Sequence, residues 1–135
     1  MADLEKHNEE IVRHFFETLS SGDLERLRML LHEQATWTVM FTNIQGAREK
    51  KGPKAIIDEF LKPVREGLFE PGDPKVVIQN LILQGPRAAV EAKGLGRLKN
   101  GKDYSNHYAF MIEIKNDKVF SLREYMDSYY VSTLA

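Results

Sequence analysis

The chain has 135 residues, of which 42% are hydrophobic and 29% charged, as is usual for a single globular domain with one core. Its formal net charge of −1 gives no electrostatic reason to expect nucleic acid or an anionic membrane as a partner. No cysteine is present, which excludes disulfides, thiolate catalysis and cysteine-ligated metal ions.

Two amphipathic helices are predicted at the start of the chain. Apolar residues recur with helical spacing from Leu4 to Leu19, and Ser20-Ser21-Gly22 is a typical helix end. Asp23 is placed to cap a second helix over Leu24–Leu31, in which four leucines share one face.

The next segment changes from helix to strand and back to helix. Residues Ala35–Asn43 have the composition of a strand, and Ile44–Lys51 is predicted to be a loop. A third helix is expected from Pro53 to about Leu68, because proline suits the first helical turn. Pro63 should kink or split that helix.

Four strands are predicted in the second half of the chain. Their bounds are Val76–Leu83, Arg87–Leu98, Tyr104–Lys115 and Lys118–Asp127. One block of helices followed by one antiparallel sheet predicts a single α+β domain over residues 1–135.

The last two strands form a predicted hairpin whose register decides which side chains face the core. A three-residue loop at Lys115–Asp117 sets Phe110 opposite Leu122 and Tyr108 opposite Glu124. A two-residue turn would pair apolar with charged side chains, and a shift of one residue turns a whole strand over. We therefore favour the first register, which points a carboxylate and a phenol toward the core.

The preceding hairpin has small residues opposite these polar ones. If its loop is Lys99–Gly101, Gly94 faces Asn106 and Ala92 faces Tyr108. The missing side-chain volume predicts a hollow beside the polar groups, although glycine in a strand also marks a bulge or bend. A sheet curved at its glycines is compatible with both interpretations.

The opposite face of the sheet is unusually apolar for a solvated surface. It is predicted to carry four charged or titratable residues together with three apolar ones: Glu91, Lys93, His107, Arg123, Leu95, Met111 and Tyr125. This mixture indicates dimerisation of two chains through their sheets.

Three segments carry a resemblance to a known family. They are Gly94–Gly101, Tyr104–Tyr108 and Arg123–Asp127. With these segments the chain resembles SnoaL-like and ketosteroid-isomerase-like proteins of the nuclear-transport-factor-2-like superfamily, over nearly its whole length. The resemblance implies a cone-shaped α+β fold, in which N-terminal helices pack on a strongly curved mixed or antiparallel sheet around an apolar pocket, and a homodimer.

The resemblance argues against two known mechanisms of this superfamily. Limonene-epoxide hydrolase holds its water with a tyrosine and an asparagine, which correspond to Phe41 and Asn43 here. The last aspartate of its catalytic Asp-Arg-Asp trio corresponds to Glu124. The arginine and the first aspartate of that trio fall at about Ala92 and Gly94, which have no functional group. The basic aspartate of ketosteroid isomerase falls near Val39. Asn43 and Glu124 are retained, but neither mechanism keeps its complete set of functional groups in this sequence.

Three residues remain as candidates for acid/base chemistry: Glu124, Tyr108 and Asn43. Burial should raise the pKa of the Glu124 carboxyl toward neutrality, and the tyrosine and asparagine could stabilise an oxyanion. Glu124 and Tyr108 could equally form a buried structural pair. The predicted lining of the pocket is Trp37, Val39, Phe41, Ala92, Gly94, Asn106, Phe110, Leu122 and Met126.

Three functions stay open at this point. The first is a cofactor-free cyclase or isomerase acting on a small, mostly apolar molecule, the second a carrier or sensor of such a molecule, and the third a dimeric assembly domain with a vestigial pocket. No cofactor is expected, and the four histidines lack the spacing of metal ligands. No apolar run resembles a signal peptide or could span a bilayer, so we expect a cytoplasmic protein without membrane contact.

Overall fold

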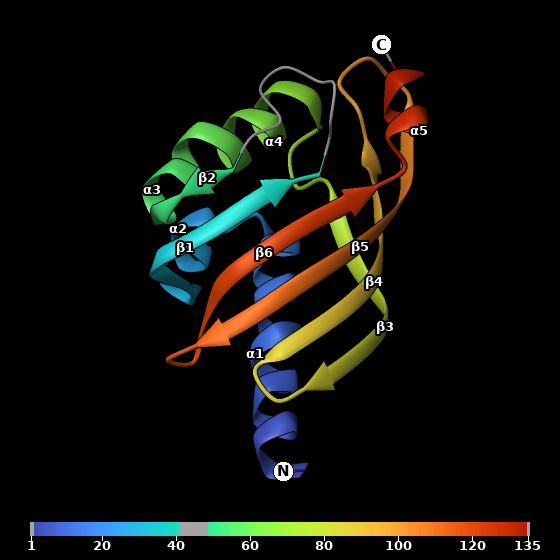
Figure 1. Cartoon of the computed structure of the whole chain (residues 1–135). Helices are drawn as coiled ribbons and strands as arrows, with labels where there is room; N and C mark the ends of the chain where they lie inside the picture. The colour runs from blue at the N-terminus through green and yellow to red at the C-terminus, as the bar shows by residue number, and fades with distance from the viewer. Residues whose placement is uncertain (1, 41–48, 135) are drawn as a thin grey trace.

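The computed structural model describes residues 2–40 and 49–134. Figure 1 shows a strongly curled sheet with the longest helix lying along its inner face and the other helices gathered toward one end. The helices in chain order are α1 Ala2–Ser21, α2 Leu24–Leu30, α3 Gly52–Lys54, the π-helix η1 Ala55–Leu61, α4 Lys62–Leu68 and α5 Ser128–Ser132. The predicted α+β fold class is confirmed. No helix among the described residues is long and apolar enough to cross a membrane.

The boundary between the first two helices follows the predicted signals. Gly22 adopts a left-handed φ of 82° after α1, a conformation that glycine reaches without strain. The side chain of Asp23 then accepts a hydrogen bond of 3.1 Å from the backbone N–H of Arg26 and caps α2. These local residues fix the sharp reversal that brings α2 back against the sheet.

The third predicted helix runs without a gap from Gly52 to Leu68 but is divided into α3, η1 and α4, and the change from η1 to α4 falls directly before Pro63. The stretch Ala55–Leu61 before the proline is π-helical, and the backbone N–H of Lys62 bonds to the carbonyl of Ile57. A proline has no N–H to donate and its ring crowds the preceding turn, so a wider turn just before it relieves both problems.

Six strands form one mixed sheet in the order β2-β1-β6-β5-β4-β3. Only the β1–β6 pair is parallel among the described strands. The strands are β1 Leu31–Val39, β2 Lys50–Lys51, β3 Lys75–Gln84, β4 Arg87–Arg97, β5 Asp103–Lys115 and β6 Lys118–Met126. The first strand begins at Leu31, which was predicted to be helical, and its predicted end at Asn43 lies outside the described residues.

The predicted register of the β4–β5 hairpin is confirmed. Gly96 pairs with Tyr104, Gly94 with Asn106 and Ala92 with Tyr108. The sharp turn uses Gly101, whose φ is 89°.

The predicted register of the β5–β6 hairpin is wrong: Phe110 pairs with Glu124, two residues beyond the predicted partner Leu122. Lys115 pairs directly with Lys118, so the turn has two residues, Asn116 and Asp117, with left-handed φ of 53° and 60°. Such a turn matches the twist of the strands it joins.

A β-bulge then restores the alternation of the two faces. Ile114 pairs with Val119 but Glu113 pairs with Ser121, which leaves Phe120 as the extra residue. Glu124 therefore lies opposite Phe110 and not opposite Tyr108, although both polar residues point to the inner face as predicted.

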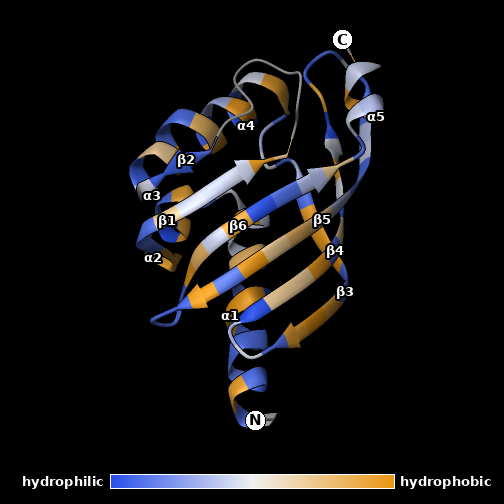
Figure 2. Cartoon of the chain, viewed as in Figure 1, coloured by the Kyte–Doolittle hydropathy of each residue, from blue (hydrophilic) through white to orange (hydrophobic). Residues whose placement is uncertain are grey.

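The core lies between α1 and the inner face of the sheet. Phe16 of α1 packs on Phe110 with ring centroids 4.9 Å apart, and Phe15 contacts Trp37 with centroids 6.1 Å apart. Apolar and polar residues alternate along α1 and the strands, as Figure 2 shows, so each element turns one face inward. This packing positions the inner face of the sheet beneath the open end of the curl.

Candidate active site

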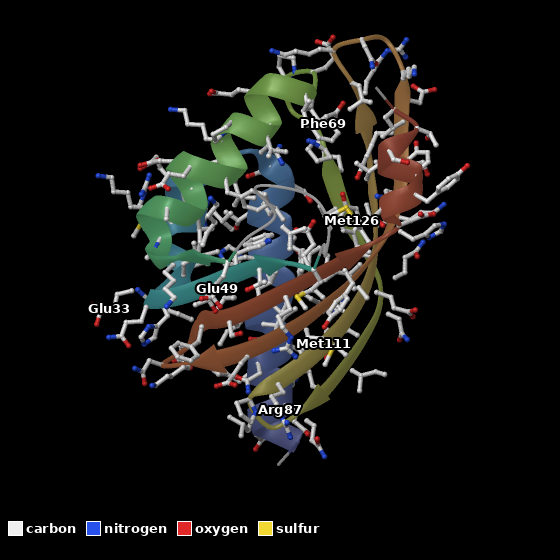
Figure 3. The ribbon with its side chains drawn as sticks, turned by 45° about the horizontal axis from the view of Figure 1, so that its top comes forward. Glu33, Glu49, Phe69, Arg87, Met111 and Met126 are labelled. Carbon is white, nitrogen blue, oxygen red and sulfur yellow. The ribbon has the colours of Figure 1, made fainter. Side chains whose placement is uncertain are left out.

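A cavity of about 920 Å³ opens between the curled sheet and the helices. Its size is in the range of small-molecule sites. Figure 3 turns this end forward and shows Phe69 and Met126, two of the lining residues, between α4 and α5. Most of the other lining side chains are apolar too, among them Leu19, Trp37, Val39, Phe60, Leu61, Val64, Leu68, Val76, Leu98, Phe110, Val131 and Leu134.

A single buried carboxyl group lines this cavity among the described residues. Glu124 of β6 is only 7% exposed, and its Oε1 accepts a hydrogen bond of 2.9 Å from the indole Nε1 of Trp37. Burial raises the pKa of Glu124 to about 7, and the Trp37 hydrogen bond opposes part of that rise. The carboxyl group can therefore either give up or take a proton near neutral pH.

Trp37 reaches Glu124 because β1 lies beside β6 in the sheet. In that parallel pair Val39 is aligned with Glu124 and Trp37 with Leu122. The indole ring packs edge-on against Phe60 of η1, with centroids 5.7 Å apart, which fixes its N–H toward the carboxyl group.

Replacing Trp37 by phenylalanine tests this hydrogen bond. Loss of the donor should raise the pKa of Glu124 further and destabilise the protein by ~1–3 kcal/mol, because a buried acceptor loses its partner. The loss should be larger at pH 8, where the carboxylate form needs the donor, than at pH 5. Urea denaturation at both pH values measures the difference, and an equal loss at both would show that the N–H does not support the charge.

A second polar group is built from three residues on the inner face of β5. The hydroxyls of Tyr104 and Tyr108 are hydrogen-bonded to each other, and Asn106 Nδ2 donates to the Tyr104 hydroxyl at 3.0 Å. Burial is the main reason that the pKa of both tyrosines is raised, so both stay protonated near neutral pH. No hydrogen bond joins Tyr108 to Glu124 in the described structure, so the two do not form the directly bonded pair that was considered from the sequence.

The hollow predicted above Gly94 is filled. A Cβ added at this glycine would lie 2.6 Å from Cε1 of Tyr108 and 3.4 Å from Cε2 of Tyr104. The glycine therefore makes room for the tyrosine rings, and the open space lies farther toward the helices.

This close contact predicts a destabilising effect of the smallest substitution. Gly94→Ala should cost ~1–3 kcal/mol because the Tyr108 ring has to move. Gly67→Ala in α4 is the matched control: nothing lies within 4 Å of its added Cβ, and alanine should be neutral or stabilise the helix. The melting temperature, measured by thermal unfolding, should fall for Gly94→Ala and should stay the same or rise for Gly67→Ala. Equal melting temperatures of the two variants would contradict the tight packing at Gly94.

The structure brings together six of the candidate residues at the cavity wall: Glu124, Tyr108, Trp37, Val39, Phe110 and Met126. Four others are buried behind that wall and are not part of the lining, namely Ala92, Gly94, Asn106 and Leu122. The candidates Phe41 and Asn43 lie outside the described residues.

Six polar lining residues were not identified from the sequence, namely Lys50, Glu59, Arg65, Lys99, Asn100 and Tyr104. Tyr104 has the same strand phase as Asn106 and Tyr108, so the alternation of the strand already placed it on the inner face. Arg65 sits on a helix that carries charged residues on several sides, and its sequence context gives no such signal. No group of three His, Asp or Glu residues within the described part of the chain could hold a metal ion.

Comparison with known proteins gives one family and many similar structures. The SnoaL-like domain family matches residues 12–122. Bal32a from a soil-derived mobile gene cassette is 25% identical, with a TM-score of 0.77 and 93% of each chain covered. A nuclear-transport-factor-2-like protein of unknown function from Burkholderia pseudomallei is 18% identical, with a TM-score of 0.81 and coverage of 95% of this chain and 96% of that chain.

A third similar structure holds a ligand. TerC, co-crystallised with polyporic acid, is 18% identical, with a TM-score of 0.80 and coverage of 95% of this chain and 97% of that chain. At this identity the likeness concerns the fold alone. Comparison with curated protein sequences found no match.

Proposed function

Because the chain belongs to the SnoaL-like domain family, we propose that it binds a small, mostly apolar molecule in the cavity and catalyses a cofactor-free proton transfer on it, as an isomerase or cyclase does. The observation that carries this proposal is the position of Glu124. It lines an apolar cavity of about 920 Å³ and has a pKa raised to about 7. A general base works best when its pKa is near the working pH.

The tyrosine cluster supplies the complementary group. In the proposed reaction Glu124 removes a proton from a carbon next to a carbonyl group, and Tyr108 donates a hydrogen bond to the carbonyl oxygen as it becomes an enolate oxygen. Asn106 donates to Tyr104, and Tyr104 can donate in turn to Tyr108, which leaves the Tyr108 proton for the ligand. Asn43 remains a proposed second donor. The proton then returns from Glu124 to another atom of the same molecule, so no cofactor is consumed.

Exchange of solvent deuterium tests this function without knowledge of the natural substrate. The protein should accelerate the loss of the acidic C–H signals of 2-tetralone in D₂O, followed by NMR. The rate should rise with pH up to about 7 and then level off, since the base is the ionised form of Glu124. The neutral apolar compound N-phenyl-1-naphthylamine should inhibit by filling the cavity. An unchanged exchange rate with and without the protein would contradict the catalytic proposal.

A non-catalytic carrier of an apolar ligand is the second candidate. The observation that favours it is that the hydroxyls of Tyr104 and Tyr108 are hydrogen-bonded to each other. For a carrier, the naphthylamine should bind while neither 2-tetralone nor related ketones exchange deuterium.

We also propose that two chains associate through the outer face of the sheet. The same contact would form the dimer if the protein were an assembly domain with a vestigial pocket. Met111 and Tyr125 are 39% and 41% exposed on neighbouring strands, with Arg123 paired to Met111 between them. Met111→Asp removes one of these apolar side chains and would force a carboxylate to lose its water in the interface, so it should convert a dimer into a monomer. Light scattering during gel filtration measures the mass; a wild-type monomer at high protein concentration would refute the association.

A further inference from the structure

One wall of the cavity holds a cation that forms no salt bridge within the described part of the chain. Arg65 of α4 lines the cavity, is half-buried, and donates from Nη1 to the carbonyl of Pro74 at 3.1 Å. No carboxylate of the described residues forms an ion pair with it. Burial lowers the pKa of Arg65, and the nearby charge of Asp73 only partly opposes this effect.

The other N–H groups of Arg65 have no hydrogen-bond partner among the described residues. Every fully buried side-chain nitrogen or oxygen of the described residues has a hydrogen-bond partner. The guanidinium nitrogens that lack one are therefore not fully buried, and Arg65 is one of the residues that line the cavity. A guanidinium presents its N–H groups as a flat fork, which fits two oxygens of an oxyacid anion.

From this arrangement we infer that the ligand of the cavity carries an anionic oxyacid group, such as a carboxylate, and that Arg65 binds it. The inference rests on the proposed function, since it describes the molecule that occupies the same site. It narrows the ligand class from a small apolar molecule to an amphipathic organic anion.

The place of Arg65 also limits the length of that molecule. Its Nη2 lies 3.3 Å from an added Cβ at Gly22, and Pro74 directly precedes β3, so the guanidinium sits at the β3 edge of the sheet. Glu124 is on β6, three strands away in the order of the sheet. At ~4.8 Å per strand the separation is ~14 Å along the sheet, and less across the curl. An apolar body of two or three fused rings would join the two groups.

Arg65 also has a structural role that the experiment must separate. The last turn of α1 contains no basic residue, and Arg65 places a positive charge beside Gly22 at that end. A cation at a helix C-terminus stabilises the helix. This role concerns stability and predicts no preference between charged and neutral ligands.

A pair of fluorescent probes that differ by one anionic group separates the two roles. They are 8-anilinonaphthalene-1-sulfonate and the neutral N-phenyl-1-naphthylamine. Arg65→Met should weaken binding of the sulfonate by roughly tenfold or more and leave the affinity for the naphthylamine within about twofold, since charge-assisted hydrogen bonds contribute only to the first. Unchanged naphthylamine binding also shows that the variant is folded.

Lys99→Met is the matched control, because it removes the same charge from an exposed position that lines the same cavity. It should change sulfonate binding much less than Arg65→Met. If Arg65→Met does not fold, Arg65→Lys can be used instead, because lysine keeps the positive charge at the end of α1 but lacks the planar pair of guanidinium N–H groups. Arg65→Lys should still weaken sulfonate binding severalfold. If the arginine substitutions change the affinities for both probes equally, or change neither affinity, Arg65 is not an anion site. That result would leave the binding of apolar molecules in the cavity unaffected. Failure of both probes to bind the wild type would refute the proposed function as well.

Discussion

Replacing Glu124 by glutamine is expected to slow deuterium exchange into 2-tetralone by ~10²–10⁴-fold, the usual contribution of a general base. Glutamine has nearly the same shape, and its side-chain oxygen can still accept the hydrogen bond from Trp37. The cavity should therefore keep its form, and the affinity for N-phenyl-1-naphthylamine should change little. Exchange rates from NMR and binding from fluorescence measure the two effects on the same samples.

Glu59→Gln is the matched control for this experiment. Glu59 of η1 also lines the cavity but is exposed, so its carboxylate is solvated. Its substitution should leave the exchange rate nearly unchanged. A large decrease in both variants, or in neither, would show that Glu124 does not hold the special position assigned to it.

Stability that depends on pH is the second large effect expected from the same residue. The pKa of Glu124 is raised from 4.5 in the unfolded chain to about 7 in the folded protein. The folded state therefore holds a proton that the unfolded state has released between these two values. The stabilisation is fully present below pH 4.5 and is lost as the pH rises through 7, by ~3 kcal/mol in total.

Glu124→Gln should remove this dependence, because the amide does not titrate. Relative to the wild type, the glutamine variant should gain ~3 kcal/mol, or about 10 °C in melting temperature, on going from pH 5 to pH 8. Groups common to both proteins cancel in this comparison. Parallel melting temperatures across the range would mean that the carboxyl group is not held in an apolar environment.

The sequence allowed the faces of the strands to be predicted more reliably than their register. Inward positions follow from the alternation of apolar residues, so Glu124 and Tyr108 were placed correctly on the inner face. The predicted register of β5 and β6 was wrong because the turn has two residues and Phe120 is an extra residue in β6. Each of these features shifts the pairing by one residue, so together they change the partners but keep the inward face. That phenylalanine packs edge-on against His32, with ring centroids 5.0 Å apart, and this distant partner is not visible in the strand pattern.

The candidate site was predictable where it depends on strand alternation and not where it depends on side-chain conformation. The pairing of Gly94 with Asn106 was correct, yet the space above the glycine holds the Tyr108 ring. The partner of Glu124 could not be found either. Trp37 comes from a strand that runs parallel to β6, and the sequence does not show that these two distant segments are neighbours.

A titration of the Glu124 side chain by carbon NMR tests the central claim most directly. Wild-type protein with ¹³C-labelled glutamate is compared with Glu124→Gln, which identifies the one carboxyl signal that disappears. We expect this signal to titrate with a midpoint of about 7. A midpoint near 4.5, the ordinary value of a glutamate, would show a solvated carboxylate and would contradict both the acid/base role and the apolar site around it.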